Sequence, residues 1–240
     1  MIPYIVINGI SSKTVNGLLI QSLPPISKPK KRTSIEEVDG RDGDIVTTLG
    51  YSAYDKEFTI GLYGDYNVDD VITFFNTEGI ITFSNEPEFY YKFAQYEQID
   101  FNKLIRFKTA KVKIHVQPFK YSESETIKNY SYAEGTTSAN ISVRNDGNIY
   151  SKPTLTITGK GAINVYLGNT QILDIALDDT EAETIIINAE QMNAYDSDGN
   201  YMNRQVTGNY DNLIFKAGVN NLIIEGYITS VSIDNYSRWI

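Results

Sequence analysis

The chain has no cysteine, one histidine and one tryptophan among its 240 residues. Without cysteine it forms no disulfide and no thiolate metal site, and it has no cysteine nucleophile. The single histidine, His115, lacks the partners that a catalytic triad or a histidine-based metal site needs. No run approaches the roughly 18 apolar residues of a membrane span. The opening residues are expected to form a strand and not a signal peptide, which fits synthesis in a reducing cytoplasm.

Basic residues are also few. The chain carries 21 basic and 30 acidic residues, a formal net charge of -9. Residues 1–130 hold fifteen basic and seventeen acidic side chains, whereas residues 131–240 hold six and thirteen. An acidic chain is a poor binder of nucleic acid, which requires lysine and arginine to replace counterions. The composition therefore argues against sequence-specific nucleic-acid binding.

Short β-branched runs separated by glycine-containing turns predict a mainly β protein. One short helix is expected over Val68–Asn76, where Asn67 is a good N-cap, two aspartates occupy the first turn, and Gly79 marks the end. In the first half the strands are expected at Tyr4–Asn8, Val15–Ile20, Thr33–Val38, Ile45–Leu49, Lys56–Tyr63, Ile80–Ser84, Tyr90–Gln98 and Ile105–Pro118.

A change in composition predicts a domain boundary near residue 130. Residues 121–139 are rich in Ser, Thr, Glu, Asn and Tyr, which gives domains at 1–130 and 131–240. The spacing of short strands in the second domain suits a jelly-roll or lectin-like β-sandwich. Those strands are expected at Ser138–Val143, Pro153–Thr158, Ile163–Leu167, Gln171–Leu177, Thr184–Asn188, Met192–Tyr195, Leu213–Phe215, Asn221–Glu225 and Thr229–Asp234.

The segment Pro24–Arg32 has three prolines and four cations in nine residues, so it is expected to be an exposed loop. It is either a solvated connection between strands or a loop that docks on a partner. Further along, Asp39–Asp44 contains two Asp-Gly turn signals. The 18 tyrosines suit both protein interfaces and ordinary β-sheets, and the sequence leaves these two interpretations open.

Every candidate catalytic, cofactor-binding or metal-binding motif has the wrong spacing or the wrong sequence context. Asp196–Asn200 begins like a calcium loop but lacks glycine at the sixth position and glutamate at the twelfth, so it is interpreted as a hairpin turn. Gly159-Lys160-Gly161 lacks the third glycine of a dinucleotide fingerprint, and Ser27–Lys30 matches a Ser-x-x-Lys spacing only by chance. Carboxylates that could be paired for glycoside hydrolysis lack aromatic platforms around them; they are Asp174, Asp178, Asp179, Glu181 and Glu183. We predict no enzyme activity, cofactor or metal.

Several turn and strand motifs occur in an order that covers nearly the whole chain. In the first half they are Ile7-Asn8-Gly9, Gly40-Arg41-Asp42-Gly43, the helix Val68–Asn76 followed by Gly79–Ser84, and Lys111–Gln117 running into Pro118–Tyr121. In the second half they are Asn145-Asp146-Gly147, Pro153, Gly159, Gly208-Asn209-Tyr210, Gly218-Val219-Asn220 and Arg238-Trp239-Ile240. In this order and spacing the chain resembles the distal tail protein family of long-tailed bacteriophages.

The resemblance implies a structural protein of the virion tail tip, made in the cytoplasm of the bacterial host. It implies a β-sandwich-like, ring-forming N-terminal domain and a galectin-like C-terminal domain. Family members form a homohexameric baseplate hub that joins the tail tube to the tail-associated and receptor-binding proteins and so serves host adsorption. Insertion into a membrane is not expected.

The ring contacts are expected from the segment Pro24–Arg32, from edge strands of residues 1–120 and from the turn Gly40–Gly43. The residues are Pro24, Pro25, Lys28, Pro29, Lys30, Lys31, Arg32, Arg41 and Asp42. A ring needs heterologous interfaces, in which one patch meets a different patch on the neighbour. The main alternative function is a carbohydrate-binding β-sandwich module of a phage or cell-wall protein. A glycosidase and a tail-tube protein are further alternatives.

Overall fold

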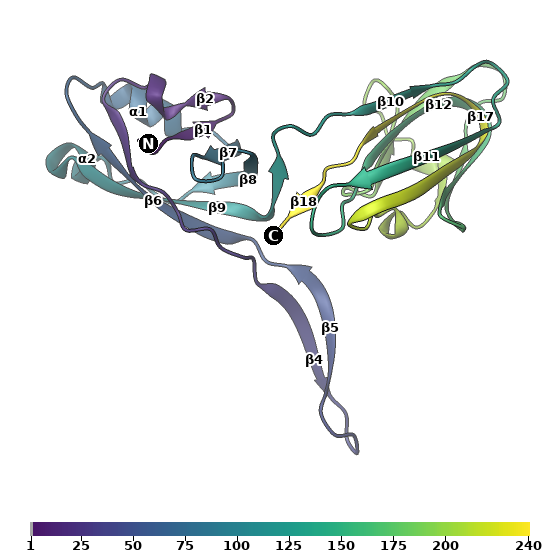
Figure 1. Ribbon diagram of the computed structural model, residues 1–240, viewed down its shortest axis with the longest axis horizontal. Helices are drawn as coiled ribbons and strands as arrows, with labels where there is room; N and C mark the ends of the chain where they lie inside the picture. Colours follow the sequence, from purple (N-terminus) through teal and green to yellow (C-terminus); the bar gives the residue numbers. More distant parts are fainter. Residues whose placement is uncertain (1) are drawn as a thin grey trace. The chain divides into compact units, whose positions relative to one another are not determined.

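A computed structural model describes residues 2–240 of the chain, except for the side chains of residues 95 and 96. This part of the chain is mainly β, with two α-helices, and divides into two compact units (Figure 1). The first unit comprises residues 1–123 with Ile240, and the second comprises residues 124–239. Each unit is built around its own cluster of buried apolar side chains. A mainly β chain is therefore confirmed.

The first unit contains strands β1 to β9. Their bounds are Ile5–Ile7, Ile10–Ser11, Leu18–Ser22, Lys31–Glu37, Asp44–Tyr51, Tyr54–Leu62, Gly79–Phe83, Phe89–Tyr96 and Thr109–Ser122, and a short 3-10 helix covers Ser12–Thr14. One antiparallel sheet has the order β2-β1-β7-β8-β9-β6-β3. Strands β4 and β5 pair with each other in a separate two-stranded sheet.

Alternation along β6 and β9 builds the core of the first unit. Phe58 lies opposite Val112, and both are at most 1% exposed. The alternate positions are mostly exposed or half-buried, and several of them are charged, as period-2 alternation in a half-buried strand predicts. Phe58 also contacts Phe83 and Phe75, at ring-centroid distances of 5.9 and 6.3 Å. The aromatic rings therefore join the sheet to the helix that carries Phe75.

That helix is α1, Val68–Phe75, and it confirms the expected one. The side chain of Asn67 accepts a hydrogen bond from the backbone N–H of Asp69, which satisfies one of the free donors of the first turn. The helix ends at Phe75, and Gly79 opens β7 instead of terminating α1.

A second helix, α2, covers Phe101–Phe107, where only a strand starting at Ile105 was expected. The carboxylate of Asp100 accepts from the N–H of Lys103 and caps the helix. Lys108 ends it in the left-handed conformation, with φ of 58°. The prediction of a single helix was therefore wrong.

Pro118 does not stop β9, which continues to Ser122. The ladder with β6 has already ended at Val116, and the ladder with β8 shifts register between the pairs Phe93–Val116 and Tyr91–Lys120. Pro118 lies within this irregularity, where a missing N–H breaks no ladder hydrogen bond. The expectation that the strand ends at Pro118 was wrong for this reason.

The second unit contains strands β10 to β18. Their bounds are Lys128–Ser131, Ser138–Asn145, Thr154–Leu167, Thr170–Ala176, Glu183–Asn188, Asn193–Tyr195, Val206–Gly208, Gly218–Asp234 and Arg238–Trp239, and short 3-10 helices cover Asn203–Gln205 and Tyr210–Asn212. One path of the sheet runs β10-β17-β12-β13-β16. Strand β11 pairs with β17, and β14 pairs with both β12 and β15.

Glycines bend β12 and β17 where the sequence suggested that each was two strands. The ladder between them shifts register around Gly159 and between Lys160 and Asn164. A Cβ on Gly159 would lie 2.2 Å from the carbonyl oxygen of Tyr227, and Gly226 has φ of 128°. These glycines let the two long strands turn a corner together without ending. The predicted breaks at residues 159–162 and 226–228 were therefore wrong.

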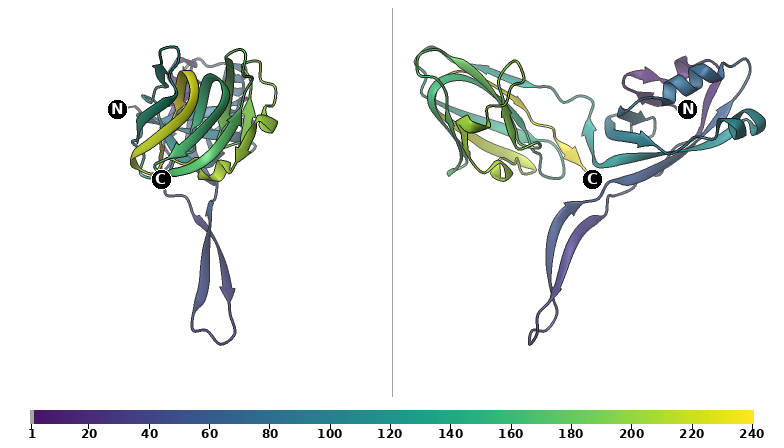
Figure 2. Two further views of the ribbon diagram at one scale, coloured as in Figure 1. Left: turned by 90° about the vertical axis from the view of Figure 1, so that its right-hand side faces the viewer. Right: turned by 180° about the vertical axis from the view of Figure 1, so that it is seen from behind.

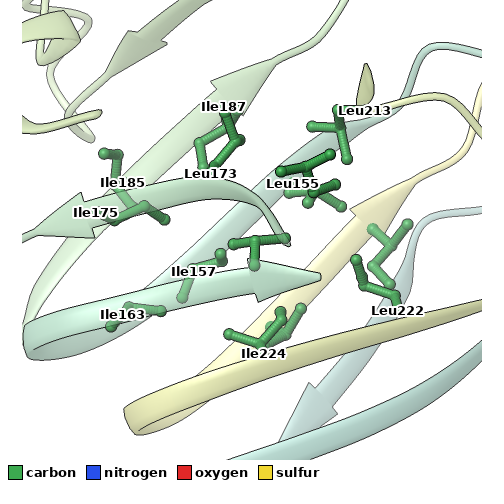
Figure 3. Close-up of a cluster of buried hydrophobic side chains, with 14 of the residues drawn as sticks. Leu155, Ile157, Ile163, Leu173, Ile175, Ile185, Ile187, Leu213, Leu222 and Ile224 are labelled. Atoms are coloured by element: carbon green, nitrogen blue, oxygen red, sulfur yellow. The ribbon is translucent and has the colours of Figure 1, made fainter. Parts of the chain in front are cut away.

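The core of the second unit lies between the bent strands and β13, β14 and the residues before β17. Figure 3 labels ten of its side chains, Leu155, Ile157, Ile163, Leu173, Ile175, Ile185, Ile187, Leu213, Leu222 and Ile224. Leu213 and Phe215 are fully buried, but they follow the last 3-10 helix and form no strand. Phe215 makes one isolated bridge to Ser151, which corrects the expected strand Leu213–Phe215.

Candidate assembly surface

Strands β4 and β5 form an extension that is almost entirely exposed. We call Lys31–Tyr51 the arm; it is labelled β4 and β5 in Figure 1 and appears in both views of Figure 2. Neither strand contains a buried residue. Ile35 and Val46 lie opposite each other and are 60% and 59% exposed. Such a ribbon, uncovered on both faces, gains little stability from burial.

The doubled Asp-Gly turn forms the end of the arm, as the sequence predicts. Gly40 and Gly43 have φ of 79° and 75°, a region that favours glycine. The backbone N–H of Arg41 donates to the carbonyl of Val38 at 3.1 Å. At the opposite end, the N–H of Ser52 donates to the carbonyl of Lys30 at 2.8 Å and closes the ribbon.

Residues 23–30, which we call the strap, connect β3 to the arm. Side chains from the sheet hold the strap by its carbonyls. Asn85 donates to Pro24 at 3.1 Å, Lys56 donates to Pro25 at 3.4 Å, and the Tyr54 hydroxyl donates to Ser27 at 3.3 Å. Because proline has no N–H, the strap cannot form a regular strand ladder. Its carbonyls accept hydrogen bonds from side chains instead.

The strap is less exposed than the sequence suggested. Pro24 and Pro29 are buried, whereas Pro25, Lys28 and Lys30 are exposed. The expectation of a fully exposed loop was wrong at these two prolines, since the hydrogen bonds to the strap press it against the sheet. It was also wrong at its end, where Lys31 and Arg32 begin β4 opposite Tyr51 and Gly50. Arg41 and Asp42 are exposed in the turn of the arm.

A cluster of buried charge lies beneath the strap. Lys56 is 2% exposed, and its ammonium lies 4.4 Å from the ring centroid of Tyr91. Burial lowers the pKa of Lys56 to about 8, although the Glu86 carboxylate opposes this shift. Glu86 pairs with Lys120 and accepts a hydrogen bond from the Tyr91 hydroxyl at 2.7 Å. Burial raises the pKa of Glu86, but these two donors outweigh it and leave the pKa below its usual value.

This cluster was not predicted from the sequence, although one signal for it exists. Lys56 occupies the same alternation phase as Phe58 and Ile60, the buried face of β6. A charged residue in that phase indicates a buried cation that needs a partner. The opposite charge near Lys56 is Glu86, which itself pairs with Lys120, and both are too far away in the sequence for any spacing rule to find them.

The single histidine has a surface position and an electrostatic partner. Nδ1 of His115 lies 2.7 Å from Oδ1 of Asp55, and both side chains are partly exposed. Lys113 binds the same carboxylate at 3.0 Å and Glu97 at 2.6 Å. Hydrogen bonds from His115 and then Lys113 lower the pKa of Asp55. Asp55 of β6 thus contacts Lys113 and His115 of β9 across the strands, and these contacts bring no nucleophile together.

The other chemical candidates are structural features of the second unit. The carboxylate of Asp196 accepts from the N–H groups of Asp198 and Asn200 and from the Asn200 amide, so the segment is a turn. Asp178 binds the N–H of Thr180 at 2.7 Å within its own loop. Across residues 2–240, apart from the two side chains set aside, no cluster of three or more His, Asp or Glu side chains could hold a metal.

The turn motifs of the second half stabilise the fold. Buried Asn145 donates to the carbonyls of Ile149 and Phe215, both at 2.9 Å. Asn220 donates to the carbonyl of Lys216 at 2.8 Å and accepts from its N–H at 2.9 Å. Arg238 is 3% exposed and pairs with Glu190. Each side chain replaces missing backbone hydrogen bonds at a turn or strand end.

A mainly apolar groove of about 480 Å³ follows β3 in the first unit. It is lined by Ile2, Pro3, Leu18, Leu19, Ile20 and Tyr63, together with Ser12 and Lys13. Lys13 lies over the ring of Tyr4, 3.8 Å from its centroid. The groove brings together no acid, base and nucleophile. Separately, none of the helices that the structure describes has the length and apolar character needed to cross a membrane.

Comparison with known proteins gives structural likenesses but no sequence match. No protein-family model matches the chain, and no curated protein matches its sequence. The crystal structure of the Dit protein of phage SPP1 superposes with a TM-score of 0.62 at 17% identity, covering 97% of this chain and 98% of that one. That protein is described as a paradigm of the hub adsorption apparatus in phages that infect Gram-positive hosts.

Two structures of the phage P2 baseplate in its activated conformation also match. Their TM-scores are 0.48 and 0.40, with 10% and 12% identity, and each match covers 97% of both chains. The first of these structures contains calcium and the second strontium. The likeness to SPP1 Dit, which extends over nearly the whole length of both chains, shows that this chain has the Dit fold.

Proposed function

We propose that this protein is the hub of a long-tailed phage tail tip, a structural component without enzyme activity. The observation that carries the proposal is the fold likeness to SPP1 Dit, which includes both units of the chain. A fold alone does not specify a function, and the site must supply the rest. Here the charged clusters of the described chain are ion pairs and turns, which suits a structural protein.

In this proposal the first unit forms a homohexameric ring that continues the tail tube, and the second is a galectin-like domain. The units, which divide between residues 123 and 124, then correspond to the predicted domains 1–130 and 131–240. The tail-associated protein and the receptor-binding proteins attach to the ring, which serves host adsorption at the virion tail tip. Support for ring formation comes from the arm, which exposes both faces of its ribbon and several large apolar side chains.

The predicted interface residues belong to this contact. Four exposed cations, Lys28, Lys30, Lys31 and Arg32, surround the base of the arm, while Arg41 and Asp42 lie in its turn. Pro24, Pro25 and Pro29 contribute by shaping the strap that positions the base. Heterologous contacts of this kind close into a ring when the rotation between neighbours allows it.

Light scattering after size exclusion tests the ring. We expect a mass about six times the 27.0 kDa chain and ring-shaped particles by negative-stain electron microscopy. The matched control replaces Lys31–Tyr51 by Asn-Gly between Lys30 and Ser52, which are already hydrogen-bonded. That variant should fold and remain smaller than the ring. A full-length protein that stays monomeric, alone and with its tail-tube protein, would contradict the proposal.

A carbohydrate-binding module is the second candidate, because the second unit exposes an aromatic pair. Tyr201 is 71% exposed, and its ring centroid lies 5.2 Å from that of Tyr195. A rigid turn at Asp196 holds the two rings together. An exposed ring beside amide groups can pack against a sugar ring. Glycan-array binding that is lost in Tyr201→Ala would favour this function, and an array without signal would remove it.

A further inference from the structure

Opposite charges lie at the two ends of the arm, and those at its base extend into the strap. Residues 24–35 contain four cations, Lys28, Lys30, Lys31 and Arg32, and no acid. Residues 36–44 contain five acids and Arg41, which leaves a net charge of -4; the acids are Glu36, Glu37, Asp39, Asp42 and Asp44. All of these charged residues are exposed. We call the four cations the arm base and residues 36–44 the arm tip.

Neither charged end is neutralised within its own chain. Among the residues that the structure describes, no ion pair joins any charged side chain of the arm base or arm tip. The neighbouring strands differ, because Lys111 pairs with Glu57 and Lys113 with Glu97, both at 2.6 Å. At a rise of about 3.3 Å per residue, Lys30 and Asp39 are about 30 Å apart. This separation exceeds the screening length of about 8 Å at physiological salt.

An uncovered apolar pair lies between the two ends. Ile35 and Val46 face each other across the ribbon, each about 60% exposed. A two-stranded ribbon is at best marginally stable without a covering surface. The arm therefore has an apolar centre flanked by charges of opposite sign, which is the pattern of a docking surface with a polar rim.

We infer that the arm tip of one copy docks on the arm base of the neighbouring copy. The net charges of +4 and -4 are equal and opposite, so one copy supplies what the next lacks. The contact is heterologous, and repeating it around a closed ring leaves no tip or base unpartnered. This inference rests on the proposed hub and adds which surfaces of neighbouring copies meet.

Charge reversal in the full chain tests the contact. The tip variant carries Glu36→Lys, Glu37→Lys and Asp39→Lys, and the base variant carries Lys28→Glu, Lys30→Glu and Lys31→Glu. A control reverses three exposed cations of the second unit, Lys128→Glu, Arg204→Glu and Lys216→Glu. All the substituted side chains are exposed, so we expect folded proteins, checked by circular dichroism and thermal unfolding.

The expected result is loss of self-association followed by rescue. Each arm variant alone should associate about a hundredfold more weakly than the wild type at low salt, because attraction becomes repulsion at three positions. The control should associate like the wild type. An equimolar mixture of the tip and base variants should assemble again, with the two chains alternating, and a chain carrying all six reversals should assemble by itself.

Three outcomes would overturn the arm contact: variants that assemble like the wild type, a mixture that stays unassembled, or a wild type that does not associate at low salt. The proposed hub fails differently. If both charge-reversal variants still form hexamers, the proposed hub is supported and the arm contact is contradicted. If the protein forms only dimers, and mixing the two variants restores those dimers, the arm contact is supported and the hexameric ring is contradicted.

Discussion

The arm and the β12–β17 pair are both long antiparallel ribbons rich in β-branched residues, yet they differ in burial. In the second unit, Leu155 of β12 lies opposite Ile233 of β17, and both are at most 1% exposed. In the arm, Ile35 lies opposite Val46, and both are more than half exposed. The same backbone pairing therefore supports a core in one region and a free surface in the other.

Because of this difference in burial, the two ribbons contribute differently to the stability of the folded monomer. Burial of alternate residues in β12 and β17 supplies stability, since each fully buried aliphatic side chain contributes about 1.5–3 kcal/mol. The arm buries almost nothing, so its apolar residues add little to the folded monomer. Substitutions in the two ribbons should accordingly affect different measurements, stability in one and association in the other.

The largest effect is expected in the core of the second unit. Leu155→Ala should lower the free energy of unfolding by about 2–5 kcal/mol, because it leaves a cavity among fully buried side chains. Urea denaturation followed by circular dichroism measures the change. Ile35→Ala in the arm is the matched control and should cost less than about 0.5 kcal/mol. Equal losses in the two variants would contradict the comparison.

The glycine corner of β17 should be nearly as sensitive. Gly226→Ala places a Cβ 2.4 Å from the carbonyl oxygen of Ala162 at φ of 128°. Strain and displacement should cost about 2–3 kcal/mol. Gly218→Ala is the control, since it also has positive φ but no atom within 4 Å, and should cost only about 1 kcal/mol. Thermal unfolding would disagree with this account if Gly218→Ala were the more damaging change.

The buried Lys56 predicts a pH dependence of stability. Its pKa is about 8 in the folded chain, whereas the ordinary value for a lysine in the unfolded chain is 10.5. Between these values the unfolded chain holds the proton and the folded chain releases it, so stability rises with pH. From pH 8 to 9.5, wild type should therefore gain stability relative to Lys56→Met, by at most about 1.4 kcal/mol per pH unit.

The Lys56 measurement needs a control for general charge effects. Lys111→Met removes an exposed cation from the neighbouring strand. We expect its stability difference from wild type to change little over the same range. The upper limit of pH 9.5 stays below the ordinary tyrosine pKa of about 10 and so limits tyrosine ionisation, and burial and Glu86 raise the pKa of Tyr91 further. A constant difference between wild type and Lys56→Met would show that Lys56 does not titrate in this range.

The smallest stability effect is expected in the arm. The double variant Ile35→Ser and Val46→Ser should change the free energy of unfolding by less than about 0.5 kcal/mol. Because these residues form the apolar centre of the arm, the same variant should weaken self-association in sedimentation equilibrium. A clear loss of stability with unchanged association would reverse the roles that we assign to the two ribbons.

Local signals made part of the fold predictable. Asn67 and the acids after it correctly located α1, and the alternation in Lys111–Gln117 correctly located β9. The Asp-Gly pairs indicated the turn of the arm for a stated reason, the need for positive φ. These signals work because their physical cause lies within a few residues.

The failures have non-local causes. Pro118 remains inside β9 because two neighbouring ladders are interrupted around it, which only the register of β6 and β8 reveals. Gly159 and Gly226 bend two paired strands, and glycine is required at each position because the backbone of the opposite strand approaches it closely. The start of the strap is held by donors from β6 and Asn85, which lie far from Pro24 and Pro25 in the sequence. For the candidate surface, the sequence indicated the cations, both strands of the ribbon and the turn between them, but not that the ribbon is uncovered on both faces.

The way the strap is held has a consequence for how the arm can vary. Its carbonyls are bound by the side chains of Asn85, Lys56 and Tyr54, and a single backbone hydrogen bond from Ser52 to Lys30 closes the ribbon beyond them. A residue inserted or deleted between Lys31 and Tyr51 therefore does not slip the register of β3 or β6. The arm can change length and sequence as an independent module, and the scaffold beneath it stays in place.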